Sequence, residues 1–228
     1  MSSARADALA GMPGVFAMPS SQPLRLAVAP RLASWNAAGH PDQVRLDAFL
    51  TAAEHLLVPR LECLAGPLAL RLDVGLPPAT RLLDQYDLDN YLFPLAVRLS
   101  GQPGRHFVSV WGTKRHAPAS FIRVEQASPA QGTLPAAFTG TVVTDRSSQS
   151  SAFKEQIHDQ LADATTLPDG PVTLQLSFTV GPRKNWLNLW KPTIDALDQI
   201  LGRSSPERSW HPRDGRVVAL GLHRRVNP

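Results

Sequence analysis

The chain has 228 residues, of which 43% are hydrophobic and 18% are charged, and its formal net charge is +4. Its single cysteine, Cys63, excludes an intrachain disulfide framework and a cysteine-based zinc ribbon. The sequence contains no run of about 18 apolar residues, which excludes a membrane-spanning helix. We therefore expect a reduced, cytoplasmic protein with a substantial core and no membrane partner.

Composition divides the chain into four segments. Residues 1–23 are rich in Ala, Ser, Gly and Pro, and they predict a flexible tail without the apolar centre of a signal peptide. Residues 127–137 have a similar composition and predict a linker. The segments 24–126 and 138–228 carry the periodic apolar patterns, and we expect them to be two folded halves.

Apolar residues in alternation predict strands, and apolar residues three or four apart predict helices. In the first half the pattern predicts a strand, a helix, a strand, a helix, a strand and an edge strand, over residues 24–29, 44–57, 68–74, 89–99, 107–115 and 121–124. In the second half it predicts a strand, a helix, a strand, a helix and a strand, over residues 139–144, 153–161, 172–180, 188–201 and 217–225. We therefore expect an α/β (mixed α+β) protein made of two βαβαβ halves.

The two halves also repeat in sequence. Residues 48–72 align without a gap on residues 152–176, and a Gly-Pro pair that stops the helix and opens the strand occupies the same place in each. Further on, Asn90 and Pro94 match Asn188 and Pro192. A duplicated chain would bury one self-complementary patch twice, so we expect a monomer that acts as an intrachain pseudo-dimer. The competing explanation is that generic strand–helix alternation looks repetitive.

The segment with the richest chemistry is Tyr86–Pro94, where Asp87 and Asp89 stand at the start of a predicted helix, directly before Asn90. Two carboxylates at this spacing can converge on one hard cation, and Mg²⁺ usually takes only one or two protein carboxylates. The simpler interpretation is that Asp89 caps the helix and Asp87 is a solvated acid favoured by the helix dipole.

The order of elements, together with Asp87-Leu-Asp89-Asn90, resembles the RusA family of Holliday junction resolvases. The family motif is Asp-x-Asp-Asn-x-x-Lys, followed by a later acidic position before the closing strand. The first half keeps both acids but has Phe93 in place of the lysine. The second half has lost both acids, at Asn185 and Leu187. It keeps the Asn-x-x-Lys part of the motif, at Asn188 and Lys191, and the later acid, at Asp214.

The resemblance implies a DNA-binding protein with two RusA-like halves and, at most, one complete Mg²⁺-dependent endonuclease site. Asp87, Asp89 and Asp214 would hold the cation, and Lys191 would offset charge on the scissile phosphate. That site requires the second half to reach across the pseudo-dimer to the first. A single site would nick one strand of a branched DNA such as a Holliday junction.

Positive charge is concentrated in the last part of the chain, where residues 182–228 hold nine Lys or Arg against four acids. Such a concentration is typical of a surface that neutralises phosphates. Trp186 and Trp190, four residues apart on one predicted helix, are expected in the core, whereas Trp210 lies in a polar loop and is a candidate for stacking on a base. The candidate DNA contacts are Asn90, Asn188, Arg183, Lys184, Arg213, Arg216, Arg224, Arg225, Lys114, Arg115 and Trp210.

Two functions from different classes remain open on the sequence. The first is a structure-selective, Mg²⁺-dependent endodeoxyribonuclease or nickase. The second is a binding module that keeps the fold, has lost the chemistry, and recognises branched DNA or a protein partner. The asymmetric loss of acidic positions favours the binding module, and the way in which the two halves complement each other favours the enzyme.

Overall fold

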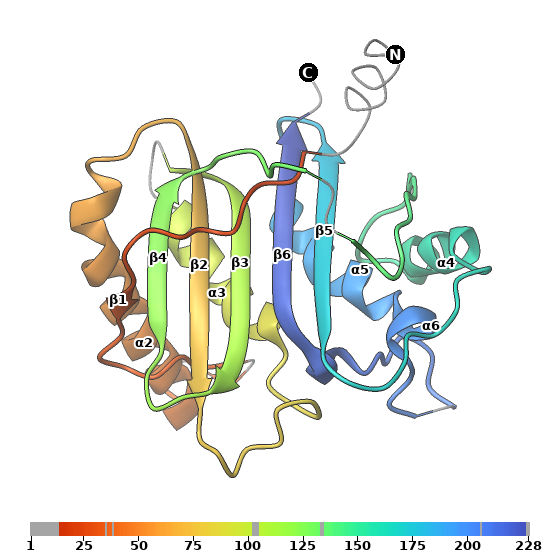
Figure 1. The fold of residues 1–228 in the computed structure, drawn as a ribbon, viewed down its shortest axis with the longest axis horizontal. Coiled ribbons are helices and arrows are strands. Elements are labelled where there is room, and N and C mark those ends of the chain that lie inside the picture. Colours follow the sequence, from red (N-terminus) through yellow and green to blue (C-terminus); the bar gives the residue numbers. More distant parts are fainter. Residues whose placement is uncertain are drawn as a thin grey trace.

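The alternating apolar segments form one mixed, six-stranded sheet in the computed structural model, which describes residues 14–34, 36–37, 39–101, 105–132, 135–205 and 207–226. The strands run in the order β1-β4-β2-β3-β6-β5 (Figure 1). Their bounds are β1 Leu24–Arg25, β2 Pro67–Leu76, β3 His106–His116, β4 Phe121–Gln126, β5 Val172–Val180 and β6 Val217–Val226. The chain is therefore a mixed α+β protein.

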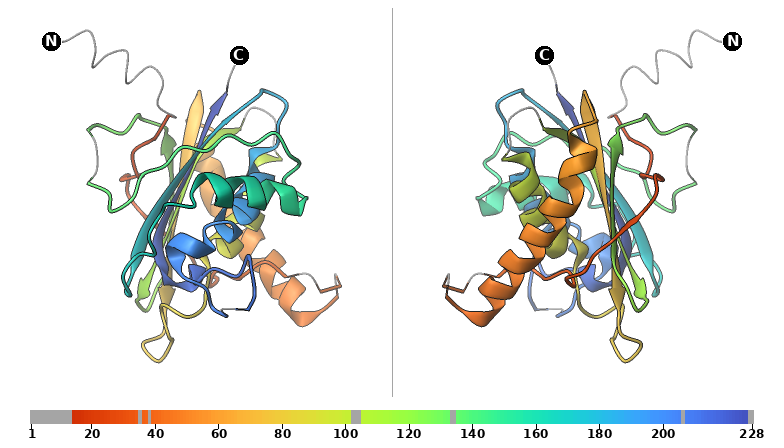
Figure 2. Two further views of the ribbon diagram at one scale, coloured as in Figure 1. Left: turned by 90° about the vertical axis from the view of Figure 1, so that its right-hand side faces the viewer. Right: turned by 90° about the vertical axis from the view of Figure 1, so that its left-hand side faces the viewer.

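Helices cover one face of this sheet, and extended segments of the chain cross the other (Figure 2). The helices are α2 Pro41–Leu61, α3 Leu88–Ser100, α4 Ser151–Gln160, α5 Trp190–Asp195 and α6 Asp198–Leu201, with 3₁₀ turns η1 Trp186–Leu189 and η2 Asp214–Arg216. Among the described helices, none combines the length and the apolar character needed to cross a membrane.

The helix predicted over residues 188–201 is broken into three short pieces, η1, α5 and α6. Pro192 lies in the first turn of α5, where its missing N–H costs no hydrogen bond. A longer helix would place the Pro192 ring against the carbonyl of Asn188, so the chain forms a 3₁₀ turn before α5 instead.

Two segments differ from the sequence-based expectation. The strand predicted over residues 139–144 is wrong, because this segment bonds to α4: Val143 N–H donates to Gln160 Oε1 at 3.0 Å, and Gln160 Nε2 donates to the Val143 carbonyl at 2.8 Å. Residues 1–13 of the predicted tail lie outside the described residues. Residues 14–23 run along the open face of the sheet, where Phe16 forms a bridge with Pro129 and Ala17 N–H donates to the Ser128 carbonyl at 2.8 Å.

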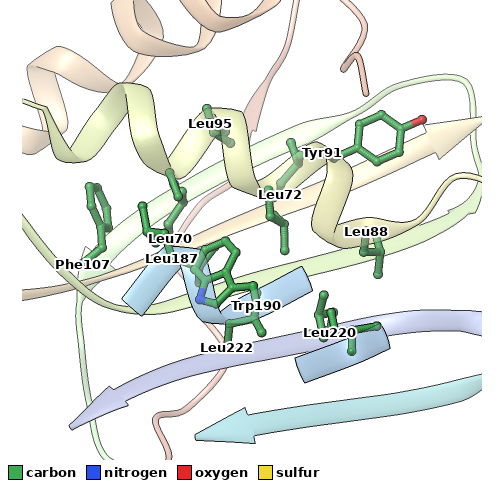
Figure 3. Packing of buried hydrophobic residues seen from close by; sticks show 14 of the residues in the cluster. Leu70, Leu72, Leu88, Tyr91, Leu95, Phe107, Leu187, Trp190, Leu220 and Leu222 are labelled. Carbon is green, nitrogen blue, oxygen red and sulfur yellow. The ribbon is translucent and has the colours of Figure 1, made fainter. Parts of the chain in front are cut away.

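The core lies between the sheet and the helices. Trp190 is fully buried in it, with its ring 5.0 Å from that of Trp186 in an edge-to-face arrangement. Figure 3 shows Trp190 amid side chains of the same apolar cluster, which include Leu72 of β2 and Leu222 of β6. The two tryptophans are therefore core residues, as expected.

The strand registers place the centre of the sheet between β3 and β6. These strands pair antiparallel from Ser109↔His223 to Thr113↔Ala219, with Trp111↔Gly221 in the middle. A Cβ on Gly221 would lie 2.8 Å from the Trp111 ring, so glycine permits this close approach. On either side stands a parallel pair, β2–β3 and β5–β6, and each pair has a register shift near its first residues.

Candidate functional site

The predicted acidic motif lies at the start of α3, where the loop after β2 passes under the end of β3 (Figure 1). Asp87 occupies the N-cap position, but its side chain accepts no capping bond; Asn90 Nδ2 donates to Asp87 Oδ2 at 3.3 Å instead. Asp89 lies within the first turn and is only 4% exposed. The interpretation of Asp89 as a cap and Asp87 as a solvated acid is therefore wrong.

Lys191 of α5 joins this motif to the second half of the chain. Its Nζ lies 2.8 Å from Asp214 Oδ2, 3.2 Å from Asp195 Oδ1 and 3.9 Å from Asp89 Oδ2. One ammonium group thus contacts carboxylates from α3, α5 and η2. The structure brings together Asp87, Asp89, Asp214 and Lys191, all four of the predicted catalytic groups.

Asp195 is a member of this cluster that the sequence analysis did not select. It lies one helical turn after Lys191 and also accepts from Lys154 of α4 at 2.8 Å. The i, i+4 spacing from Lys191 is the sequence signal that could have identified it. Because Asp195 is bonded to two lysines, it orients Lys191 beside Asp214.

A buried lysine bonds to both the loop before α3 and the η2 turn. Lys114 is 3% exposed, and its Nζ donates to the carbonyls of Gln85 at 2.8 Å, Tyr86 at 3.1 Å and Gly215 at 2.5 Å. Burial lowers the pKa of Lys114 to about 8. A Cβ on Gly215 would lie 2.7 Å from the backbone of Asp84, so the loop before α3 and the η2 turn are in direct contact.

The cluster opens onto a cleft of about 920 Å³. Its walls come from the loop before α3, from α5 and from the segment between α6 and β6. Arg203 and Trp210 line it with Arg213. Trp210 has a φ of +66°, donates its N–H to the buried Asp198 at 3.1 Å and packs edge-on against His158. A half-buried aromatic ring held in this way is a suitable surface for a base.

Burial, together with the neighbouring carboxylates, raises the pKa values of Asp87 and Asp89. Burial, and then the neighbouring Asp214 carboxylate, raise the pKa of Asp87. Burial raises the pKa of Asp89 to about 7, against the opposing effect of Lys191. Lys191 cannot cancel that desolvation because it is 3.9 Å away and shares its charge with Asp195 and Asp214. A second cation beside Asp89 would favour its ionised form.

The carboxylates of the cluster are the kind of ligand that a hard divalent cation prefers, but they are only partly positioned to bind one. Asp87 offers its carboxylate in the lining of the cleft, whereas Asp89 is buried and is not part of that lining. Mg²⁺ needs only one or two carboxylates plus water. Asp214 would join them only if its 2.8 Å contact with Lys191 opened. Across the described part of the chain, no group of three or more His, Cys, Asp or Glu is placed to hold a metal ion.

Two residues that were predicted to contact DNA are buried and bond to backbone carbonyls instead. Lys114 is buried as described, and Arg216 is 2% exposed, with its guanidinium donating to the carbonyls of Leu167, Pro168 and Gly170. Their prediction as surface contacts is wrong. A basic residue next to an apolar strand is ambiguous in sequence because only the packed structure decides which side of the strand is covered.

The remaining basic candidates lie at two opposite ends of the sheet. Arg213 and Arg115 are exposed at the end that carries the acidic cluster, and Arg213 pairs with Asp169 at 2.7 Å. At the other end, beyond β5 and β6, Arg183, Lys184 and Arg225 are exposed and Arg224 is half-buried. Since β6 has ten residues, these groups stand about 30 Å apart along the sheet. The two asparagines differ, since Asn90 bonds to Asp87 and Asn188 is exposed.

The raised pKa of Asp89 predicts how stability depends on pH. Because its folded pKa of about 7 exceeds its ordinary value near 4, ionisation opposes folding, and this group's contribution falls as pH rises from 4 to 7. We expect the free energy of unfolding to decrease by up to about 1.4 kcal/mol per pH unit in that window. Urea denaturation between pH 4.5 and 7.5 measures it. The slope should flatten in Asp89→Asn and persist in Asp159→Asn, a control at an exposed aspartate.

Comparison of the chain with protein-family models, with curated proteins and with solved structures finds no match.

Proposed function

We propose that this chain is a RusA-like, structure-selective DNA-binding protein whose acidic cleft acts as a Mg²⁺-dependent endodeoxyribonuclease or nickase on branched DNA such as Holliday junctions. One observation carries the proposal. The Lys191 ammonium contacts Asp89 from the first half of the chain and Asp214 from the second. The four groups that the resemblance selects, although divided between two degenerate motifs, therefore lie in one cluster: Asp87, Lys191 and Asp214 line the cleft, and buried Asp89 lies beside Lys191.

We also propose that the fold arose by duplication, and the strand registers support this. The register shift between Leu68 and Ala69 in the first parallel pair falls at the same repeat positions as the shift between Val172 and Thr173 in the second. Residues 107–115 and 217–225 are both apolar segments that end in two basic residues, and aligning them makes Trp111 equivalent to Gly221. These two residues face each other at the centre of the antiparallel pair. A twofold relation between the halves accounts for both features.

The twofold relation between the halves would also explain why the chain has one acidic site instead of two. In the alignment of the two halves, Asp87 and Asp89 correspond to Asn185 and Leu187. Lys191 corresponds to Phe93. A second site, at the other end of the sheet, would therefore lack both aspartates and the lysine. Asn185 caps η1 by accepting from the Leu187 N–H at 3.1 Å. All the acidic groups of the motif thus belong to one end, while the other end carries exposed cations.

Four residues in and beside the cleft would have separate roles in phosphodiester hydrolysis. Asp87 and Asp89 would hold Mg²⁺, which when bound polarises a phosphoryl oxygen and lowers the pKa of a bound water. The pKa of Asp89, raised to about 7 by burial, would fall when the cation binds, because the cation favours the ionised carboxylate. Lys191, which is about half-exposed, can offset negative charge on the phosphate. Trp210 offers a stacking surface at the wall of the cleft.

The second candidate is the binding module for branched DNA or a protein partner. It is favoured by the position of Lys191, whose ammonium already lies among Asp89, Asp195 and Asp214 and neutralises part of their charge. A site of this kind is stable without a metal ion. The cations at both ends of the sheet would still bind phosphates.

The proposal is tested with a synthetic four-way junction labelled in turn on each strand, incubated with the full chain and Mg²⁺ or Mn²⁺. A single acidic cleft predicts a nick in one strand per binding event rather than two symmetric cuts. Binding should weaken steeply as salt is raised, because phosphate contacts release counterions. Tight binding without cleavage in either metal would favour the binding module, and absence of binding would refute both DNA functions.

A further inference from the structure

A second pocket adjoins the cleft at Tyr86. This pocket of about 480 Å³ shares Leu32 and Tyr86 with the first and extends to Arg31 and Arg45. Its volume lies within the range of pockets that hold small ligands. Asp87 therefore lies beside a hollow surface that continues past the acidic cluster.

A hydrogen bond made possible by a proline in α3 joins the wall of this second pocket to the acidic cluster. Pro94 has no N–H, so the carbonyl of Asn90 one turn earlier has no partner within the helix. The N–H of Ala33 donates to that carbonyl at 2.7 Å. The segment around Arg31 is therefore attached to the first turn of α3, the turn that carries Asp89.

Tyr86, which separates the two pockets, has an unusual backbone. Its φ is +65°, a region that bulky L residues rarely adopt. Buried Lys114 holds it there by donating to the carbonyls of Gln85 and Tyr86. A conformation that is maintained in this way, beside a cluster of acids, is typical of a functional position. It keeps a half-buried aromatic side chain in the wall of both pockets.

The second pocket carries a net positive charge, because its lining contains two arginines, Arg31 and Arg45, and one acid, Asp42. Arg31 is exposed, and Arg45 is exposed and paired only with Asp42 of the same helix, at 3.3 Å, among the described residues. Such a surface pair opens readily because it is screened by water. Guanidinium groups bind phosphates through paired N–H donors. The second pocket can therefore accept an anion that the acidic cluster would repel.

We propose that the second pocket is a nucleotide subsite, in which a base stacks on Tyr86 and the phosphate next to the scissile one binds Arg31 and Arg45. This inference rests on the proposed function and extends it to the choice of substrate. A base can reach Tyr86 only when it is unstacked from its duplex, as at a branch point. The subsite thus gives a physical reason for preferring branched DNA over a continuous duplex.

The subsite is tested by fluorescence anisotropy with a four-way junction and a chain that carries Asp87→Asn to prevent cleavage. Replacing Arg31 and Arg45 by alanine should weaken binding at least about fivefold and reduce the slope of log K against log salt by roughly 1.5. The matched control, Arg146→Ala, removes an exposed arginine that lines neither pocket and should change neither quantity.

Two variants of Tyr86 separate the ring from the backbone. Tyr86→Phe keeps a stacking surface and should bind the junction as the parent does. Tyr86→Asn tolerates the left-handed backbone but has no ring, so it should lose about fivefold or more in junction affinity and little in duplex affinity. A parent that binds the junction, with no change in any variant, would overturn the subsite alone. A parent that does not bind would overturn the proposed function with it.

Discussion

Replacing both Asp87 and Asp89 by asparagine is expected to reduce Mg²⁺-dependent cleavage of a four-way junction by about 10³-fold or more. Both groups are the proposed cation ligands, and an amide does not supply the negative charge that holds the cation. Junction affinity should stay the same or increase, because two negative charges near the phosphate are removed. Cleavage under single-turnover conditions and anisotropy in the absence of metal measure the two effects.

The same substitution separates a catalytic role from a structural one. Asp89 is buried and its pKa is raised to about 7, so Asp89→Asn should leave the fold at least as stable at pH 8. Loss of cleavage therefore cannot be attributed to unfolding. Asp159→Asn serves as the control at an exposed helix position. Cleavage that persists in the double variant would place the chemistry outside this cleft.

Lys114→Met is expected to lower the free energy of unfolding by about 3 kcal/mol and to abolish cleavage. Methionine fills a similar volume but leaves the carbonyls of Gln85, Tyr86 and Gly215 without their donor, and each unsatisfied buried group costs about 1–3 kcal/mol. Without that donor the loop before α3 is no longer tied to η2, so Asp87 and Asp214 should separate.

The control for this variant is the next residue in the same strand. Arg115 is exposed, and Arg115→Met should change the free energy of unfolding by less than about 0.5 kcal/mol. Urea denaturation and junction cleavage measure both variants. If Lys114→Met were as stable and as active as the parent, Lys114 would not hold the two sides of the site together.

Much of the local structure follows from the sequence alone. The strands at residues 68–74, 107–115, 172–180 and 217–225 and the helix at residues 89–99 can be recognised because their apolar residues repeat at the period of the element they form. The start of α3 was predicted within one residue, since acids are common at a helix N-terminus. The burial of Trp186 and Trp190 was also predicted, from their spacing of one helical turn.

Where the sequence analysis went wrong, a tertiary contact overrode a local pattern. Residues 139–144 alternate like a strand, but the side chains of α4 take the hydrogen bonds that a strand partner would have taken. Residues 14–23 have the composition of a flexible tail, yet they find backbone partners on the open face of the sheet. Composition and periodicity describe a segment by itself and contain no information about such distant partners.

The tertiary structure alone decided how the candidate site is assembled. The sequence by itself determined which carboxylates and lysines were available. Asp214 lies far along the chain from Asp89, and the two carboxylates come to the same Lys191 ammonium because the antiparallel pairing of β6 with β3 joins the two halves into one sheet. Lys114 and Arg115 differ because adjacent side chains on a strand point to opposite faces, and the segments that pack on the strand determine which face is buried. Burial then turned one lysine into a structural donor and left the adjacent arginine exposed to solvent.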